Sequence, residues 1–238
     1  MNYKPISVVI FVLLVFLIPI ILLIFNFNNV VFNGDFYKKE FSKYNVYSNL
    51  AQYDVEKINK EVLFYLKNGK NQEIIANDFF NAREKQHLLD VRNLIAKLFF
   101  AYHISIFLFL SSFLALCLHF NFKFRKIIEK FLLALLSGNF FVLVAGILLF
   151  FLWNSNFYFI FGALHETFFP AGTYSFNPGF EKIVVLYPEN LFFDALSEIL
   201  LQTILSSIII IFLVFLFFSD VFRAKFSNFF LKIFRRKT

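Results

Sequence analysis

The sequence predicts an all-α membrane protein: a four-transmembrane-helix bundle with a small α+β extracytoplasmic cap formed by the first and third loops. Of its 238 residues, 59% are hydrophobic and 16% are charged, whereas soluble domains have roughly 45 to 50% apolar and 25% charged residues. Several apolar runs reach the length of about 20 residues that a helix needs to cross the hydrocarbon layer of a bilayer. The excess of hydrophobic residues therefore belongs in a membrane.

Four apolar runs define the predicted spans. They cover residues 6–27, 94–120, 131–153 and 199–218. The first run is longer than the apolar core of a signal peptide, which has roughly 7 to 15 residues, and no small-residue cleavage site follows it. We therefore expect it to remain in the protein as the first span, and we treat the whole chain as one membrane domain.

Basic residues orient these spans. Cytoplasmic loops are rich in Lys and Arg, and such residues crowd the segments 121–130 and 219–238, whereas acidic residues dominate 154–198. We therefore expect both termini in the cytoplasm and the segments 28–93 and 154–198 outside it. This topology accounts for the formal net charge of +7, and we predict no nucleic-acid partner.

The outer segments contain three predicted elements of secondary structure. Apolar residues at helical spacing predict a helix at 54–67. A second helix is expected to begin after Asn81, a favourable N-cap, with Glu84 completing a capping box, and to continue into the second span. In the second outer segment, the run 182–187 has the composition of a β-strand.

Three side chains with acid–base chemistry follow Asn81 at steps of three residues: Glu84, His87 and Asp90. At this spacing they are neighbours on a helix surface, and a carboxylate raises the basicity of a nearby imidazole and fixes its tautomer. The alternative interpretation is a solvated helix face with incidental pairing. His165 follows an aromatic stretch at the same predicted membrane surface, so we expect the two histidines to meet.

Other chemistry has weaker support in the sequence. His103 lies within the second span and His119 near its cytoplasmic end, and Cys117 has no cysteine partner, so we interpret Cys117 as a small apolar residue. No nucleophile elbow, His-Glu-x-x-His pair, P-loop or dinucleotide fingerprint is present. Glu84, His87 and His165 together leave open a zinc site with three protein ligands. A metal-dependent membrane hydrolase or protease is therefore one alternative function, and a non-catalytic membrane assembly subunit is another.

Four short motifs in the outer segments carry a resemblance to a known family. They are Phe80-x-x-x-Glu84-x-x-His87-Leu88-x-Asp90-Val91, Leu164-His165-x-x-Phe168-Phe169, Tyr174-x-Phe176-Asn177-Pro178 and Leu186-Tyr187-Pro188-Glu189-x-x-Phe192-Phe193. With its four spans and loop lengths, the chain resembles the bacterial lipoprotein intramolecular transacylases, a family of small membrane enzymes. It departs from the expected pattern at two positions, with Tyr174 in place of tryptophan and Glu181 in place of aspartate.

The resemblance implies a reaction within one substrate molecule. The sn-2 acyl chain of a diacylglyceryl-modified lipoprotein moves to the α-amine of its own N-terminal cysteine, which gives a lyso-form lipoprotein. Exchange of an ester for an amide within one molecule needs orientation and proton transfer more than an enzyme nucleophile, and no cofactor is expected. The implied partners are such lipoproteins and membrane lipid, and the implied location is the bacterial inner membrane.

The resemblance also suggests roles for residues in a site on the outer face. His87 is expected to remove a proton from the amine, which titrates at about pH 7.7 to 8.0. The pKa of its imidazole, ordinarily about 6.5, is expected to be raised by Glu84 or Asp90. His165 is expected to stabilise the oxyanion or to return a proton to the leaving glycerol oxygen, although the sequence leaves open which histidine takes which role. Six residues are predicted to orient these groups or the substrate: Glu84, Asp90, Glu166, Tyr174, Asn177 and Glu189.

Overall fold

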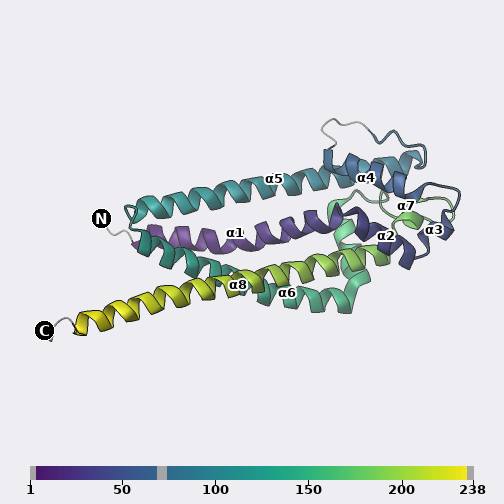
Figure 1. Ribbon diagram of the computed structural model, residues 1–238. Coiled ribbons are helices and arrows are strands. Elements are labelled where there is room, and N and C mark those ends of the chain that lie inside the picture. Colours follow the sequence, from purple (N-terminus) through teal and green to yellow (C-terminus); the bar gives the residue numbers. More distant parts are fainter. Residues whose placement is uncertain (1–3, 69–73, 235–238) are drawn as a thin grey trace. The chain divides into compact units, whose positions relative to one another are not determined.

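Helices are the only regular elements in the part of the chain that the structure describes (Figure 1). The structure is a computed structural model, which describes the backbone of residues 4–68 and 74–234 and the side chains of residues 5–68 and 74–217. The helices are α1 (Lys4–Val31), α2 (Gly34–Lys43), α3 (Val46–Asn49), α4 (Val55–Asn68), α5 (Ala82–His119), α6 (Phe124–Phe168), α7 (Ile183–Leu186) and α8 (Glu189–Phe234).

Four of the described helices, α1, α5, α6 and α8, are long and apolar enough to cross a membrane. This agrees with the predicted all-α membrane class and with the predicted number of spans. The basic side chains predicted for the cytoplasmic tail at 219–238 lie outside the described residues. α5 and α6 have 38 and 45 residues, which correspond to about 57 and 68 Å of helix. A hydrocarbon core is about 30 Å thick, so both helices extend beyond a single crossing.

α5 begins where its capping box predicts. The backbone N–H of Asn81 donates to Oε2 of Glu84 at 2.6 Å, and the backbone N–H of Glu84 donates to Oδ1 of Asn81 at 2.9 Å. Two N–H groups at the helix start are thereby satisfied by side chains. The predicted continuation of this helix into the second span is confirmed, and α4 agrees with the helix predicted at 54–67.

Two compact units make up the chain, and α1, α5, α6 and α8 contribute to both. We call them the membrane unit, which comprises Met1–Leu22, Ser105–Ile147 and Thr203–Thr238, and the site unit, which comprises Leu23–Ile104 and Leu148–Gln202.

Aliphatic and small residues pack the helices of the membrane unit. Leu14, Leu116 and Ala134 are each 1% exposed and belong to one cluster. Gly138 allows α6 to approach α1 closely, because a Cβ atom at this position would lie 2.6 Å from Cδ1 of Ile18. Small residues at helix crossings are typical of helices that associate within lipid.

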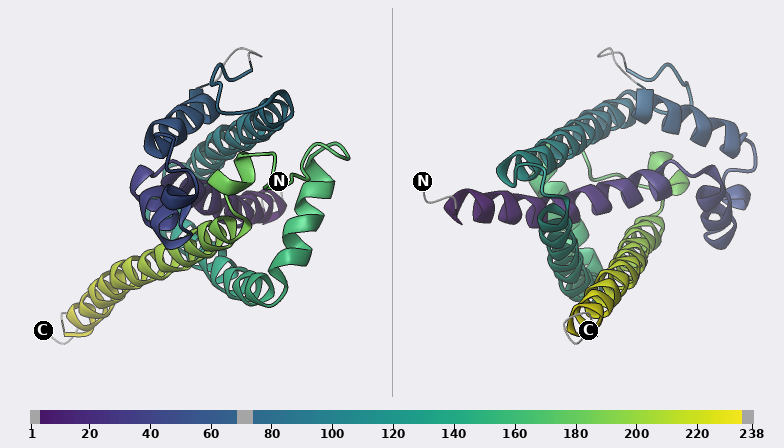
Figure 2. Two further views of the ribbon diagram at one scale, coloured as in Figure 1. Left: turned by 90° about the vertical axis from the view of Figure 1, so that its right-hand side faces the viewer. Right: turned by 60° about the vertical axis from the view of Figure 1, so that its left-hand side comes forward.

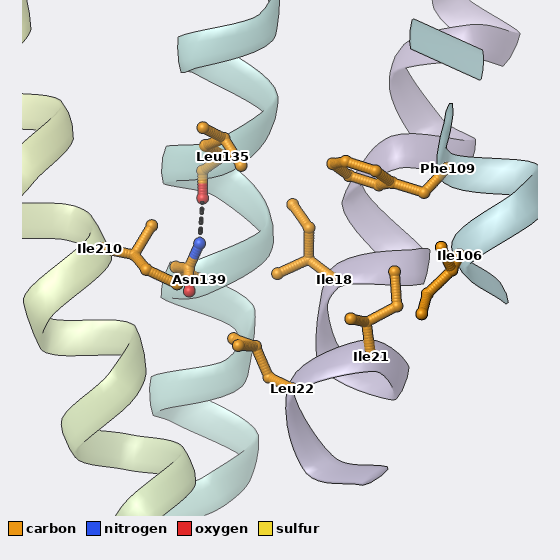
Figure 3. Close-up of a pocket in the computed structure, with 8 residues that line it drawn as sticks. All are labelled: Ile18, Ile21, Leu22, Ile106, Phe109, Leu135, Asn139 and Ile210. Atoms are coloured by element: carbon orange, nitrogen blue, oxygen red, sulfur yellow. Dashed lines mark hydrogen bonds between the residues drawn. The ribbon is translucent and has the colours of Figure 1, made fainter. Parts of the chain in front are cut away.

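An apolar pocket of about 210 Å³ lies within the membrane unit (Figure 3). Its lining is hydrocarbon except for Asn139 of α6, which is fully buried. The amide nitrogen of Asn139 donates to the carbonyl oxygen of Leu135 at 2.8 Å, one turn earlier on the same helix. The amide oxygen has no hydrogen-bond partner among the described residues, so the pocket holds one unsatisfied acceptor.

A second hydrophobic core lies among the short helices of the site unit (Figure 1). Its most deeply buried members are at most 1% exposed and come from α2, α3, α4, α7 and the first turn of α8: Phe41, Val46, Val62, Leu186 and Leu191. Short isolated helices are marginal in water. The burial of these side chains, worth roughly 1.5 to 3 kcal/mol for each large one, therefore holds the short helices in place.

The run 182–187, predicted as a strand, is a helical turn. The backbone N–H of Leu186 donates to the carbonyl oxygen of Lys182 at 2.8 Å. Ile183 and Leu186 are buried, which is a helical spacing, whereas a strand buries alternate residues. With no strand beside it in the described parts of the chain, the run satisfies its backbone groups within a turn. The predicted α+β cap is therefore wrong, and the cap as described is helical.

α6 bends shortly before its end (Figure 2). Asn156 has non-helical angles, with φ −138° and ψ 33°. Just before it, the side chains of Asn154 and Ser155 each donate to a backbone carbonyl four residues earlier at 2.8 Å, a type of bond that often bends a helix. The last turns of α6 therefore leave the line of the helix, and they carry His165.

Candidate active site

His87 and His165 lie next to each other in the site unit. His87 stands in the second turn of α5, and His165 stands at the end of α6. Their ring centroids are 6.3 Å apart, and the ring planes are inclined by 19°. The structure thus brings together the two histidines that the sequence analysis selected, from elements far apart in the chain.

Aromatic side chains surround the two imidazoles. The centroids of Phe169 and Phe176 lie 4.8 and 5.2 Å from that of His87, which is only 8% exposed. The ring of Tyr174 lies 5.6 Å from His165. Exclusion of water from such a site strengthens electrostatic interactions within it and suppresses hydrolysis of reactive groups.

The two histidines differ in their hydrogen bonds. Nδ1 of His165 lies 2.8 Å from the carbonyl oxygen of Phe161. Because a carbonyl only accepts, this nitrogen carries the hydrogen, and Nε2 of the neutral ring is an acceptor. Nδ1 of His87 is buried without a hydrogen-bond partner among the described residues. His165 is therefore anchored by its own helix, while His87 keeps an unused ring nitrogen.

The surroundings of His87 lower its basicity. Burial and, secondarily, the charge of a protonated His165 lower the pKa of His87 from 6.5 to about 4. His87 stands in the charged first turns of α5, ahead of the apolar part of that helix. The expectation that Glu84 or Asp90 raises this pKa is wrong, because desolvation disfavours the charged ring. His87 is thus neutral near pH 7 and able to accept a proton.

Glu84 connects α5 to α7 and does not serve the imidazole. Its side chain is 1% exposed. Its Oε2 atom caps the start of α5. Its Oε1 atom accepts a hydrogen bond from the backbone N–H of Ile183 at 2.7 Å. This N–H lies at the start of α7 and therefore has no acceptor within its own helix. Asp90, the other predicted carboxylate of this face, accepts from the amide of Gln86 at 3.4 Å.

Arg83, which no sequence motif indicated as a site residue, contacts the loop between α6 and α7 at four points. Its guanidinium donates to Oε1 of Glu181 at 2.8 Å, to the carbonyl oxygen of Gly172 at 2.8 Å, and to the carbonyl oxygen of Ser175. It also lies over the ring of Phe176, 5.0 Å from the centroid. The hydrogen-bond partners are 89 to 98 residues away in sequence, so no local pattern reveals them.

A compact turn supports the same loop. Oδ1 of Asn177 accepts the backbone N–H of Gly179 at 2.9 Å, and Oε2 of Glu181 accepts the backbone N–H of Asn177 at 2.7 Å. Asn177 therefore acts in the turn. Glu166 and Glu189 are exposed.

The remaining histidines lie outside this arrangement. Nδ1 of His103 is 2.6 Å from the carbonyl oxygen of Phe99 on its own helix, and His119 packs on Phe120 at 4.9 Å. Among the side chains of residues 5–68 and 74–217, no three from His, Cys, Asp or Glu gather so that they would hold a metal ion.

Comparison with known proteins identifies the family. The sequence pattern of the family described as lipoprotein intramolecular transacylase Lit matches residues 12–193. The fold is similar to that of the membrane integral lipoprotein intramolecular transacylase Lit from Bacillus cereus, with a TM-score of 0.76 and 20% identity over 94% of this chain and 99% of that chain. Two variants of that protein, with a histidine replaced by arginine or by alanine, give TM-scores of 0.75 and 0.74 at 19% identity, over 93% and 91% of this chain and 96% of theirs.

No curated protein sequence matches the chain. The family match nevertheless covers most of its length. The chain belongs to the lipoprotein intramolecular transacylase (Lit) family.

Proposed function

We propose that this chain is a lipoprotein intramolecular transacylase, which moves the sn-2 acyl chain of a diacylglyceryl-modified lipoprotein to the α-amine of its N-terminal cysteine. One observation carries the proposal: in a chain of the Lit family, two imidazoles lie 6.3 Å apart within an aromatic shell. Such a shell favours attack by an amine held in the same molecule over attack by water.

The reaction balances with a single proton transfer. The neutral amine attacks the ester carbonyl, a C–N bond forms, the C–O bond to glycerol breaks, and one proton passes from nitrogen to the glycerol oxygen. An amine that has attacked a carbonyl becomes strongly acidic, so an imidazole of low pKa is able to take its proton. The same low pKa makes protonated His87 a ready donor to the leaving oxygen.

His165 is assigned to the oxyanion of the tetrahedral intermediate. Its Nδ1–H is committed to Phe161, so Nε2 is the ring nitrogen available to the substrate. When the ring is protonated, Nε2 donates to the developing negative charge, and the carbonyl of Phe161 stabilises the charged ring. Tyr174, which packs on His165, keeps the ring oriented.

We place the protein in the bacterial inner membrane, with both termini in the cytoplasm and the histidines at the outer face. The distribution of basic residues supports this topology. Near the end of α6, Tyr158, Phe159 and Phe168 are 67%, 79% and 52% exposed. Exposed aromatic residues favour the interface between lipid and water, and His165 on the same helical segment would thus lie at the depth of the ester groups of a lipid.

A lipoprotein assay tests the function. The chain is expressed in cells that lack other enzymes that acylate lipoprotein amines, and the N-terminal peptide of a lipoprotein is analysed by mass spectrometry. We expect one acyl chain on the amine and one fewer on the glycerol. A free amine throughout, with the protein present in the membrane, would exclude the proposal. The metal-dependent hydrolase or protease and the non-catalytic subunit are not favoured, because neither accounts for the family match.

A further inference from the structure

Phe176 contacts both Arg83 and His87. The guanidinium carbon lies 5.0 Å from the ring centroid, and the imidazole centroid lies 5.2 Å from it. Arg83 and His87 are four residues apart on α5, so their side chains share one face of the helix. The aromatic ring that covers His87 therefore also lies against a cation from the same helix face.

Arg83 also holds the loop on both sides of Phe176. On the N-terminal side of Phe176, Arg83 donates hydrogen bonds to the carbonyl oxygens of Gly172 and Ser175. On the C-terminal side it pairs with the carboxylate of Glu181. A guanidinium presents several donors in a rigid plane and stacks on aromatic faces, which a lysine ammonium does not reproduce. Three polar contacts and one aromatic contact thus converge on a single side chain.

We propose that Arg83 is a positioning residue of this site, which holds Phe176 against His87 and so keeps water away from the imidazole. The inference rests on the proposed function, in which His87 carries the transferred proton. It extends the site to a side chain that acts on His87 through Phe176.

The groups around His87 show why this cover matters. The titratable or charged side chains to consider are His165, which stacks on His87, and Tyr174, which packs on His165. Arg83, Glu84 and Asp90 stand three or four residues from His87 on α5, and Glu181 pairs with Arg83. Glu84 and Glu181 are engaged by Ile183 and Arg83. Burial is the largest cause that lowers the pKa of His87, so entry of water should move this pKa back towards its ordinary value.

Histidine NMR tests the proposal without substrate. The chain has four histidines, and a His87→Gln variant assigns the signal of His87 in the purified protein labelled with ¹⁵N-histidine. We expect His87 to stay neutral down to about pH 5 in the wild type and to titrate at about pH 6.5 in Arg83→Ala and in Phe176→Ala. Arg83→Lys, which keeps the cation and loses the planar fork, should give an intermediate value.

Lys85 provides a matched control on the same turn of α5, because it pairs with Asp78 at 3.8 Å and not with the loop. Lys85→Ala should leave the titration of His87 unchanged. An unaltered titration in both Arg83→Ala and Phe176→Ala overturns the inference, and so does an equal change in Lys85→Ala. With the purified enzyme and a diacylglyceryl lipopeptide, Arg83→Ala should lower kcat on the order of 10²-fold, with partial recovery in Arg83→Lys. Since the titration needs no substrate, failure of the positioning role is distinguishable from failure of the proposed function.

Discussion

Glu84 and Ile183, 99 residues apart in sequence, are joined by a buried hydrogen bond of 2.7 Å from the backbone N–H of Ile183 to Oε1 of Glu84. The other oxygen of the same carboxylate caps the start of α5. One side chain thus serves the start of two helices, and it ties the helix that carries His87 to the segment that follows the aromatic loop.

Replacement of Glu84 by alanine should destabilise the protein. The buried N–H of Ile183 loses its acceptor, which costs about 1 to 3 kcal/mol. The less buried N–H of Asn81 also loses its acceptor and adds about 1 kcal/mol, so we expect a loss of about 2 to 4 kcal/mol. Thermal unfolding of the purified protein in detergent measures this loss. Glu166→Ala, which changes an exposed carboxylate, is the control and should unfold like the wild type. Equal stability of Glu84→Ala and wild type would contradict the role of the carboxylate.

His87→Ala and His165→Ala should each remove the lyso-form product. General acid–base catalysis contributes typically 10² to 10⁴-fold, so we expect the rate to fall by at least about 100-fold in each variant, while the protein still accumulates in the membrane. Mass spectrometry of the lipoprotein peptide gives the measurement. His103→Ala, at a histidine bonded to its own helix, should retain the product. Product formation with both site histidines replaced would exclude the assigned roles.

The pH dependence should follow the substrate amine and not His87. The pKa of His87 is lowered to about 4, so the ring remains neutral from about pH 5.5 upwards, whereas an α-amino group titrates at about pH 7.7 to 8.0. The rate should therefore rise with pH as the amine loses its proton. Initial rates from about pH 5.5 to 9 test this, and a rate that does not rise through the range of the amine would contradict it.

Asn139→Leu should stabilise the membrane unit. The substitution removes a buried acceptor that lacks a partner among the described residues, and the adjoining pocket of about 210 Å³ has room for the larger side chain. We expect the free energy of unfolding to rise by about 1 kcal/mol. Asn139→Ala is the matched variant: it also removes the acceptor but enlarges the cavity, which is destabilising. The leucine variant should therefore be more stable than both the alanine variant and the wild type. A leucine variant less stable than the wild type would be inconsistent with an orphaned amide oxygen.

A chelator should leave the transacylation unaffected, because the proposed chemistry uses only the two imidazoles. The purified enzyme is incubated with EDTA and assayed with a diacylglyceryl lipopeptide. Inactivation that a divalent metal reverses would instead support the metal-dependent alternative.

Local interactions made several features predictable from the sequence. The four spans follow from apolar runs, because transfer of apolar residues into hydrocarbon is favourable wherever the run is long enough. The start of α5 follows from Asn81 and Glu84, because a capping box lies within four consecutive residues. The prediction of His87 and His165 as site residues rested on short sequence motifs next to the second and third spans.

Contacts between distant segments decided the rest. The run 182–187, rich in β-branched residues, forms the helical turn α7. The N–H of Ile183 donates to the buried carboxylate of Glu84, and no strand lies beside the run in the described parts of the chain. Arg83 acquired its role from partners at least 89 residues away. The low pKa of His87 arises from the rings that bury it, and the sequence suggested the opposite direction. Membrane spans and helix caps depend on residues that are neighbours in the sequence. The burial of His87 and the pairing of Arg83 depend on which distant segments come into contact when the chain folds.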